Sequence, residues 1–295
     1  MTDDDQKWPA RDEMVAAAPV LPEPEDDPDA AARVRRVYRK LIWNAPGWDV
    51  VERAHAPFAF RTKGRVRAFG PKGRRPNLSN LEAFAPPPQS WDWRQHIKMA
   101  PPMDQGKCNS CTAFAMAATL TDLATIKFGY LCASLSPGHL HRCVGGADCG
   151  TALDPMSLAN LAEQHPIALW QPGDFPYNPA NCPTAKGQGR VGSVQYIYTP
   201  DQAFQALQHG PLLAVIDLYD DFWSNYGGQV YHHSAGIKIA AHSVELIGYD
   251  LTGQYWIIKN SEGAGWGAAG FGRIAFGECR LLTPGGHTAL QLQLA

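Results

Sequence analysis

The sequence predicts an α+β protein, because helical and strand patterns occupy different parts of the chain. Between Cys111 and Lys127, apolar residues recur at the spacing of one helix face. After Gly210 the pattern changes to short runs rich in β-branched and aromatic residues, as expected for strands. Helices followed by strands indicate the α+β class rather than alternating α/β units. At 295 residues the chain is long enough for two lobes.

The individual elements follow in chain order. A long helix is expected over residues 111–127 and a shorter one over 157–164, each from an apolar stripe at helical spacing. In the second half, four apolar runs bounded by turn residues predict strands. These strands are expected over residues 212–216, 239–249, 255–258 and 271–276.

The N-terminal part differs from the rest in charge. Residues 1–30 carry a net charge of −8 and are rich in Ala and Pro, which predicts a disordered acidic segment. Residues 31–75 carry a net charge of +11, and their first thirteen residues have the pattern of a short basic amphipathic helix. We therefore divide the chain into residues 1–30, a segment over 31–88 and a folded domain over 89–295.

Two classes of partner are disfavoured by composition. The basic loop 61–75 has few interleaved aromatic residues and no nucleic-acid motif, so we interpret it as a solvated connector and expect no nucleic-acid partner. No stretch of 18 apolar residues occurs, so no membrane span is expected.

One short motif carries most of the chemical information. Gln105 precedes Cys111 by six residues, and Cys111 opens the predicted long helix. A thiol at a helix N-terminus experiences the positive end of the helix dipole, which favours the nucleophilic thiolate. An amide held nearby can donate a hydrogen bond to a developing oxyanion. The motif therefore indicates a catalytic cysteine with Gln105 as oxyanion donor; the alternatives are a buried structural cysteine and an exposed loop glutamine.

A thiol nucleophile needs a base and a group that orients the base. His242 lies in an apolar strand pattern and is the candidate base, and Asn260 follows the next strand and is the candidate orienting group. The neighbouring His232 and His233 compete with His242, but they lack spaced partners for a metal site. Asn260 equally suits a turn that ends a strand. No cofactor and no metal are expected.

These residues and their spacing resemble the papain-like (C1-type) cysteine peptidases. Residues 108–112 (CNSCT) are similar to the family's Cys-Gly-Ser-Cys-Trp, and His242 and Asn260 follow Cys111 at the family's distance of roughly 130–150 residues. The resemblance spans about residues 90–280. It includes, in order, WDWRQ at 91–95, the cysteines at 143, 149 and 182, GP at 210–211, GWG at 265–267 and GF at 270–271.

The resemblance implies a two-lobe fold with a helical left lobe, an antiparallel β-barrel-like right lobe and an active-site cleft between them. It implies an endopeptidase that cleaves protein or peptide substrates through an acyl-enzyme on Cys111, with His242 as base and then acid. It also implies a zymogen, so part of residues 31–88 is expected to act as a leader that blocks the cleft. The excess of Arg (16) over Lys (10), with high Pro and Ala, favours a bacterial member with an atypical N-terminal segment.

Three positions depart from the family's pattern. Thr112 and Glu262 stand where the family has tryptophan, and residues 150–152 (GTA) stand where it has a Gly-Gly pair that contacts substrate. Glu262 is expected to place a negative charge near the leaving-group side of the cleft. By the same resemblance, Ala241 and Ser243, on either side of the expected catalytic histidine, are expected to line the main specificity pocket together with Val215. The expected substrate-binding residues are Thr151, Ala152, Val215, Ala241, Ser243 and Glu262.

The chain has seven cysteines. The resemblance implies two disulfides and two further free thiols besides the nucleophile: Cys108–Cys149, Cys143–Cys182, Cys132 and Cys279. Disulfides need an oxidising compartment, whereas the N-terminus lacks the basic and apolar regions of a signal peptide. We therefore expect secretion or export by a route without a cleaved N-terminal signal, with a cytoplasmic location and reduced thiols as the alternative.

Two other functions stay open on the sequence. The same Cys-His-Asn chemistry can pass an acyl group to an amine or act on a side-chain amide, so the chain can be an exported effector that works as an acyl transferase or deamidase. The absent tryptophans favour a third function, a low-activity binding module of the same fold. Peptide turnover and labelling by a thiol-directed epoxide distinguish the three.

Overall fold

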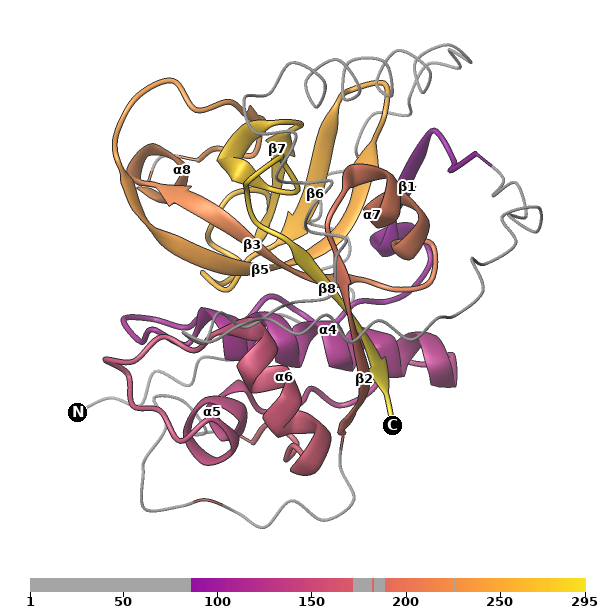
Figure 1. Ribbon diagram of the computed structural model, residues 1–295, viewed down its shortest axis with the longest axis vertical. Helices are drawn as coiled ribbons and strands as arrows, with labels where there is room; N and C mark the ends of the chain where they lie inside the picture. The colour runs from indigo at the N-terminus through magenta and orange to yellow at the C-terminus, as the bar shows by residue number, and fades with distance from the viewer. Residues whose placement is uncertain (1–85, 172–181, 183–188, 225) are drawn as a thin grey trace, which may run out of the picture.

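The expected two-lobe α+β architecture is confirmed by a computed structural model of the chain (Figure 1). The helices α4 (Cys111–Phe128), α5 (Pro137–His139) and α6 (Pro155–Gln164) lie in the lower lobe of Figure 1, whereas most of the sheet lies in the upper lobe with α7 (Pro200–Ala206) and α8 (Asp220–Ser224). The expected segment 1–30 and nearly all of the expected segment 31–88 lie outside the described residues. The structure describes residues 86–171, 182, 189–224 and 226–295.

The helical lobe is built around the predicted long helix, α4. It ends one residue later than predicted, at Phe128, and is followed by the capping residue Gly129, whose φ of 73° is the left-handed conformation that glycine adopts readily. The shorter helix, α6, begins two residues earlier than predicted because the Asp154 side chain accepts a hydrogen bond from the Ser157 N–H and caps it. The helices are α4 (Cys111–Phe128), α5 (Pro137–His139), α6 (Pro155–Gln164), α7 (Pro200–Ala206) and α8 (Asp220–Ser224), with shorter turns η2 (Trp93–Gln95), η3 (Leu140–Val144) and η4 (Glu278–Arg280).

The strands form one sheet in the order β2-β8-β3-β5-β6-β7-β4, and β1 adds to β5. All named pairs are antiparallel except β4 with β7. No ladder joins β2 to β4 among the described residues, so the sheet is not closed into a barrel. The strands are β1 (Ser90–Asp92), β2 (Val191–Ile197), β3 (Leu212–Tyr219), β4 (Val230–Tyr231), β5 (Lys238–Asp250), β6 (Tyr255–Lys259), β7 (Phe271–Ala275) and β8 (Ala289–Leu294).

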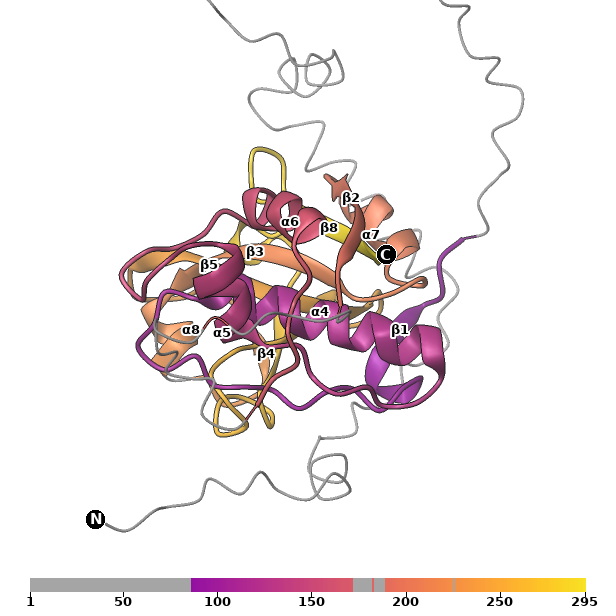
Figure 2. The ribbon, with the colours of Figure 1, turned by 90° about the horizontal axis from the view of Figure 1, so that it is seen from below.

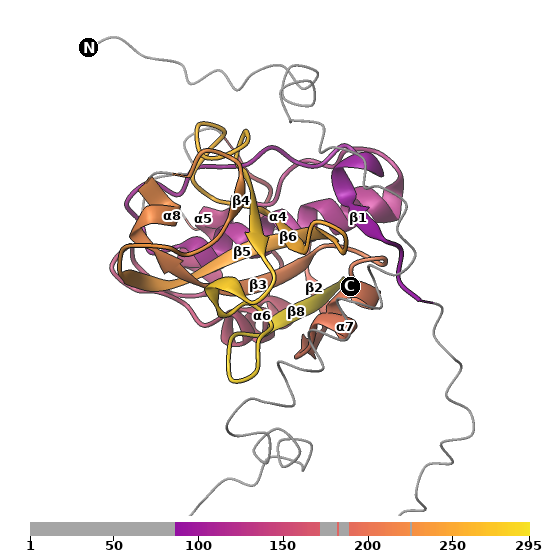
Figure 3. The same cartoon turned by 90° about the horizontal axis from the view of Figure 1, so that it is seen from above.

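The two largest of three apolar clusters in the described part of the chain flank α4 and the sheet. One fills the strand lobe around Phe204, Tyr249 and Trp256, and the other fills the helical lobe around Met116 and Leu120. The second core also takes in side chains of β3 and β8, so the two lobes share a packed boundary. Figure 2 and Figure 3 show α4 running along the underside of the strands. This boundary brings the start of α4, the middle of β5 and the end of β6 together.

Candidate active site

Cys111 is the first residue of α4 and is half-exposed. The residue before it, Ser110, caps the helix with its backbone only, so its side chain does not occupy the first-turn N–H groups. The loop before the helix is held in place: Cys108 forms a disulfide with Cys149, and the Asn109 N–H donates to the carbonyl of Cys149 at 3.0 Å. The thiol therefore sits at the positive end of an 18-residue helix.

The thiol and His242 shift each other's pKa. Burial raises the pKa of Cys111, but the hydrogen bond and the charge of His242 together lower it by more. The net pKa is lowered to about 7. The backbone of Ser243 and the side chain of Thr112 add smaller lowering contributions. Burial lowers the pKa of His242, yet its contacts with Cys111 and Asn260 outweigh burial and raise it. Both shifts favour a thiolate–imidazolium pair.

Asn260 fixes the ring of His242. Nε2 of His242 lies 2.7 Å from Oδ1 of Asn260, and both residues are buried. Because an amide oxygen only accepts, Nε2 carries a hydrogen and donates it. The other ring nitrogen, Nδ1, is then the atom that serves the thiol. Oδ1 of Asn260 is itself held by the N–H of Ser261, which donates to it at 2.8 Å.

Ser261 also holds Gln105 in place. The Ser261 hydroxyl donates to Oε1 of Gln105 at 2.6 Å, and the Gln105 N–H donates to the Ser261 carbonyl at 2.8 Å. Nε2 of Gln105 donates one hydrogen to the carbonyl of Cys108 at 2.9 Å, which leaves its second hydrogen for another acceptor. Sequence reasoning missed Ser261, although the Asn-Ser pair that contains it was the available signal.

A pair of hydroxyl groups joins the two lobes beside the thiol. Oγ1 of Thr112 donates to the carbonyl of Leu153 at 2.7 Å and lies 3.0 Å from Oγ of Ser243. Since the single Thr112 hydrogen is used on Leu153, the Ser243 hydroxyl is the donor in the second contact. Both residues are buried, so Ser243 turns its hydroxyl towards α4 and offers little surface to a substrate.

The other expected substrate-binding residues lie at differing depths. Thr151 and Ala152 are exposed, and the Thr151 hydroxyl donates to the Asp148 carboxylate at 2.8 Å. Val215 is half-buried on β3, and Ala241 is exposed on β5 just before the buried His242. Ile239, two residues before Ala241 on β5, is 40% exposed.

Glu262 lies close enough to His242 for their charges to interact. Burial raises the pKa of Glu262, whereas a hydrogen bond with the Trp223 side chain and the charge of His242 lower it; the net pKa is raised. Asp104 forms a backbone bridge with Glu262 and adds to the rise. Trp223 lies on α8 and is 47% exposed, and its hydrogen bond places the indole ring beside Glu262.

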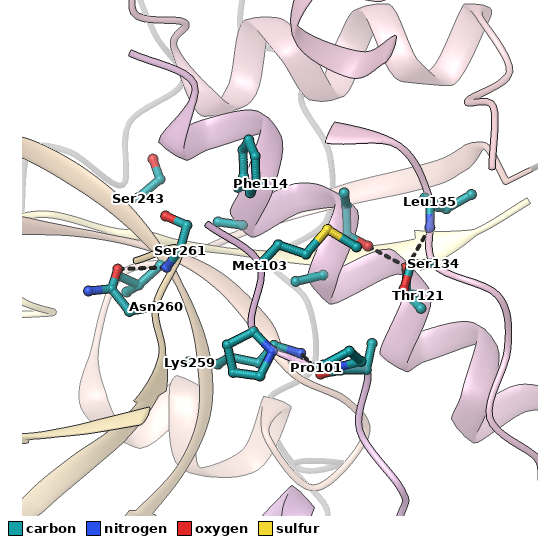
Figure 4. A pocket seen from close by; sticks show the side chains of 16 residues that line it. Pro101, Met103, Phe114, Thr121, Ser134, Leu135, Ser243, Lys259, Asn260 and Ser261 are labelled. Carbon is teal, nitrogen blue, oxygen red and sulfur yellow. Dashed lines mark hydrogen bonds between the residues drawn. The ribbon is translucent and has the colours of Figure 1, made fainter. Parts of the chain in front are cut away.

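A small pocket lies behind Asn260 and Ser261, between the loop 100–103 and α4 (Figure 4). Of its lining residues, only Ser243 was expected to bind substrate. The lining is mostly apolar with a few hydroxyl, amide and ammonium groups. It comprises Ala100, Pro101, Pro102, Met103, Phe114, Ala115, Ala117, Ala118, Thr121, Ser134, Leu135, Ser243, Val244, Lys259, Asn260 and Ser261.

The remaining candidate groups lie outside this constellation. Cys143 forms a disulfide with Cys182, and Cys132 and Cys279 are free. His232 lies 4.0 Å from Glu278 and His233 lies 3.6 Å from Asp221. Within the described ranges, no three His, Cys, Asp or Glu side chains are grouped as for a metal ion. In that same part of the chain, no helix has the length and apolarity needed to cross a membrane.

Residues 87–283 match the sequence profile described as papain family cysteine protease. Among curated proteins, papaya proteinase 4 of Carica papaya is 32% identical over 199 residues, which are 63% of this chain and 55% of that protein. The chain therefore spans about half the length of this relative.

Two solved structures are similar to this one. A Carica candamarcensis cysteine protease in complex with E-64 has a TM-score of 0.59 at 26% identity, over 70% of this chain and 98% of that one. The proform of the ragweed pollen allergen Amb a 11, a cysteine protease, has a TM-score of 0.60 at 25% identity, over 70% of this chain and 66% of that one.

Proposed function

The chain belongs to the papain family of cysteine proteases, and on this premise we propose that it is an endopeptidase that cleaves peptide bonds through an acyl-enzyme on Cys111. The observation that carries the proposal is the geometry of the base: a buried His242 oriented by Asn260 at 2.7 Å, next to a thiol whose pKa is lowered to about 7. A buried structural cysteine lacks such a partner and keeps a raised pKa, as Cys279 does.

In the proposed reaction, Sγ of Cys111 attacks the carbonyl carbon of the scissile bond. The carbonyl oxygen becomes an oxyanion that accepts hydrogen bonds from Nε2 of Gln105 and from the backbone N–H of Cys111. The imidazolium of His242 donates its proton from Nδ1 to the leaving amine, and a thioester remains. His242 then takes a proton from a water molecule, which attacks the thioester, releases the acid and restores the thiol–imidazole pair.

Substrate contacts are proposed on both sides of Cys111. Val215, Ala241 and the neighbouring Ile239 offer small and apolar walls for a bulky apolar side chain two residues before the scissile bond. Glu262 favours a basic residue just after the bond, because its carboxylate lies near His242. Thr151 and Ala152 are exposed and stay candidates for backbone contact with the peptide.

We also propose that part of residues 31–88 docks on the catalytic domain and restricts the cleft. The segment 31–75 carries a net charge of +11 against −5 for residues 76–295, so the two parts attract each other. A similar structure, that of the ragweed protease, is described as a proform. Processing in the basic loop 61–75 would then release the peptidase.

A fluorogenic peptide assay of the full chain and of Cys111→Ala, with and without a thiol-directed epoxide, tests the main proposal. We expect turnover that both the substitution and the epoxide abolish. Labelling of Cys111 without turnover of any peptide would instead indicate a transferase or deamidase. Neither turnover nor labelling, also after removal of residues 1–88, would indicate a binding module.

A further inference from the structure

Three ionisable side chains are buried together between the lobes, behind the candidate catalytic residues. Nζ of Lys259 lies 2.5 Å from Oδ2 of Asp122 and 2.7 Å from Oε2 of Glu245. Each of the three side chains is at most 1% exposed. Lys259 also donates to the carbonyl of Ala100 at 3.2 Å, and the Ala100 N–H donates to Oδ1 of Asp122 at 2.7 Å. We call Asp122, Lys259 and Glu245 the ionic junction.

Asp122 and Glu245 each share an element with a proposed catalytic residue, and Lys259 directly precedes a third one. Asp122 lies on α4, the helix that begins with the nucleophile. Glu245 lies on β5, three residues after His242, and Lys259 is the last residue of β6, directly before Asn260. Figure 4 shows Lys259 and Asn260 next to each other at the pocket. The junction therefore fixes α4, β5 and β6 relative to one another.

The loop that carries Gln105, the fourth proposed catalytic residue, is hydrogen-bonded to the same junction. Ala100, which both donates to and accepts from the junction, lies five residues before Gln105. The chain between them lines one side of the pocket in Figure 4. A shift of the junction would therefore move the loop that carries the oxyanion donor as well as the elements that carry the thiol, the base and its orienting group.

The charges of the ionic junction do not balance unless it holds a proton. Two carboxyl groups face one ammonium in a site without solvent, and a buried charge without a partner is costly. Asp122 is well partnered, because its two oxygens accept from Lys259 and from the Ala100 N–H. Oε2 of Glu245 is close to the Lys259 ammonium, at 2.7 Å, but neither oxygen of Glu245 accepts a well-directed hydrogen bond. The proton therefore belongs on Glu245.

The surroundings of Glu245 agree with this assignment. Of the elements packed against it, β6 contributes the ammonium of Lys259, α4 contributes the carboxylate of Asp122, and β3 contributes the apolar Leu213. Burial raises the pKa of Glu245, the charge of Lys259 opposes the rise, and the charge of Asp122 adds to it; the net pKa is raised to about 8.

We propose that Asp122, Lys259 and a protonated Glu245 form a neutral junction that positions the catalytic residues, and that loss of the Glu245 proton at alkaline pH both destabilises the fold and loosens the active site. The positioning half of this inference rests on the proposed function. The stability half does not, because it needs only the folded chain.

The pH dependence follows from the direction of the shift. A free glutamate has a pKa of about 4.3, so the unfolded chain releases the proton well before the folded chain does. The stability associated with Glu245 is therefore complete below about pH 4, falls as the pH rises, and is lost once the pH passes the folded pKa of about 8. Glu245→Gln copies the protonated side chain and cannot ionise, so it should remove this dependence.

The first measurement is the thermal unfolding midpoint of the full chain between pH 5 and pH 9. The midpoint of Glu245→Gln should rise relative to wild type by about 5–10 °C between pH 5 and 8 and then level off. The matched control is Glu163→Gln, at an exposed glutamate on α6, which should follow the wild type at every pH. Parallel curves for Glu245→Gln and wild type, or a Gln variant that does not fold, would overturn the proposal.

The second measurement is the rate at which a thiol-directed epoxide labels Cys111 between pH 7 and 10, well below the unfolding midpoint. If both His242 and Glu245 must keep a proton, the logarithm of the wild-type rate should fall with a slope approaching two per pH unit. In Glu245→Gln the slope should be one. A slope of one in both proteins would overturn the positioning half. Absence of any labelling, with the stability difference intact, would count against the proposed function and leave the junction standing.

Discussion

The two disulfides offer a matched test of how the loop before Cys111, the proposed nucleophile, contributes to activity. Cys108–Cys149 and Cys143–Cys182 close loops of nearly equal length, with sequence separations of 41 and 39 residues. In the chain-entropy description, a closed loop of about 40 residues stabilises a fold by roughly 4 kcal/mol. Replacing either pair by alanine should therefore lower the free energy of unfolding by a similar amount.

The two replacements should differ in their effect on catalysis. The carbonyl of Cys108 accepts the hydrogen bond that orients Nε2 of Gln105, and Cys108 lies three residues before the thiol. Removing an oxyanion donor outright costs on the order of 100-fold or more in kcat, so a donor that is only released from its support should cost about tenfold. The Cys143–Cys182 bond belongs to the η3 turn and its removal should leave kcat nearly unchanged.

The assay combines denaturant unfolding with peptide turnover, measured at a temperature where both double variants are folded by circular dichroism. Equal midpoints for the two variants, with a loss of kcat only in Cys108→Ala/Cys149→Ala, is the expected result. An equal loss of kcat in both variants would refute the assigned role of the loop. A larger loss in Cys143→Ala/Cys182→Ala would refute it as well.

The remaining predictions concern the proposed site and the N-terminal segment. Cys111→Ala should abolish peptide hydrolysis without changing the unfolding midpoint, and Asn260→Ala should be milder than His242→Ala because Asn260 orients rather than reacts; full activity in Cys111→Ala would refute the assignment. Alkylation of Cys111 should be half-maximal near pH 7, and His242→Ala should move that point upwards, because the effect of burial on the thiol pKa is then opposed only by the smaller contributions of Ser243 and Thr112. Glu262→Gln should weaken a preference for a basic residue just after the scissile bond, and a substrate-library profile of wild type that favours acidic residues there would contradict the placement. Removal of residues 1–88 should raise turnover, and high salt should weaken inhibition by the isolated segment; unchanged turnover would show that the segment is not inhibitory.

Elements with strong periodicity could be predicted from the sequence. The apolar stripe that begins at Cys111 gave α4 to within one residue, and the apolar runs after Gly210 gave β3, β5, β6 and β7 with small errors at their ends. β2 could not be found in this way, because it is an edge strand with both ends buried and most of its middle exposed. Its pairing with β8, about a hundred residues later, decides its conformation rather than its own pattern.

The candidate site could be proposed from residue type and order, whereas the long-range contacts that support it could not. Cys111, His242, Asn260 and Gln105 have side chains whose chemistry suggests their roles. Glu245 does not: an acid in an apolar strand indicates a buried charge, but its counter-ions come from other elements. Lys259 contacts Asp122 although 137 positions separate them in the sequence, and no local sequence pattern predicts such a pair.

The two faces of β5 contact different lobes. His242 lies opposite Ile216 of the strand-lobe core, whereas Ser243 contacts α4 through its hydroxyl and Glu245 belongs to the ionic junction. Successive side chains of a strand point to opposite faces. Inserting or deleting one residue after Ala241 would therefore turn every later side chain of β5 to the other face. Evolution can therefore tune this strand by substitution, but length changes should be confined to the exposed start of β5, where residues 238–241 face solvent. A library of single-residue insertions and deletions along the chain should show this boundary as an abrupt loss of folded protein.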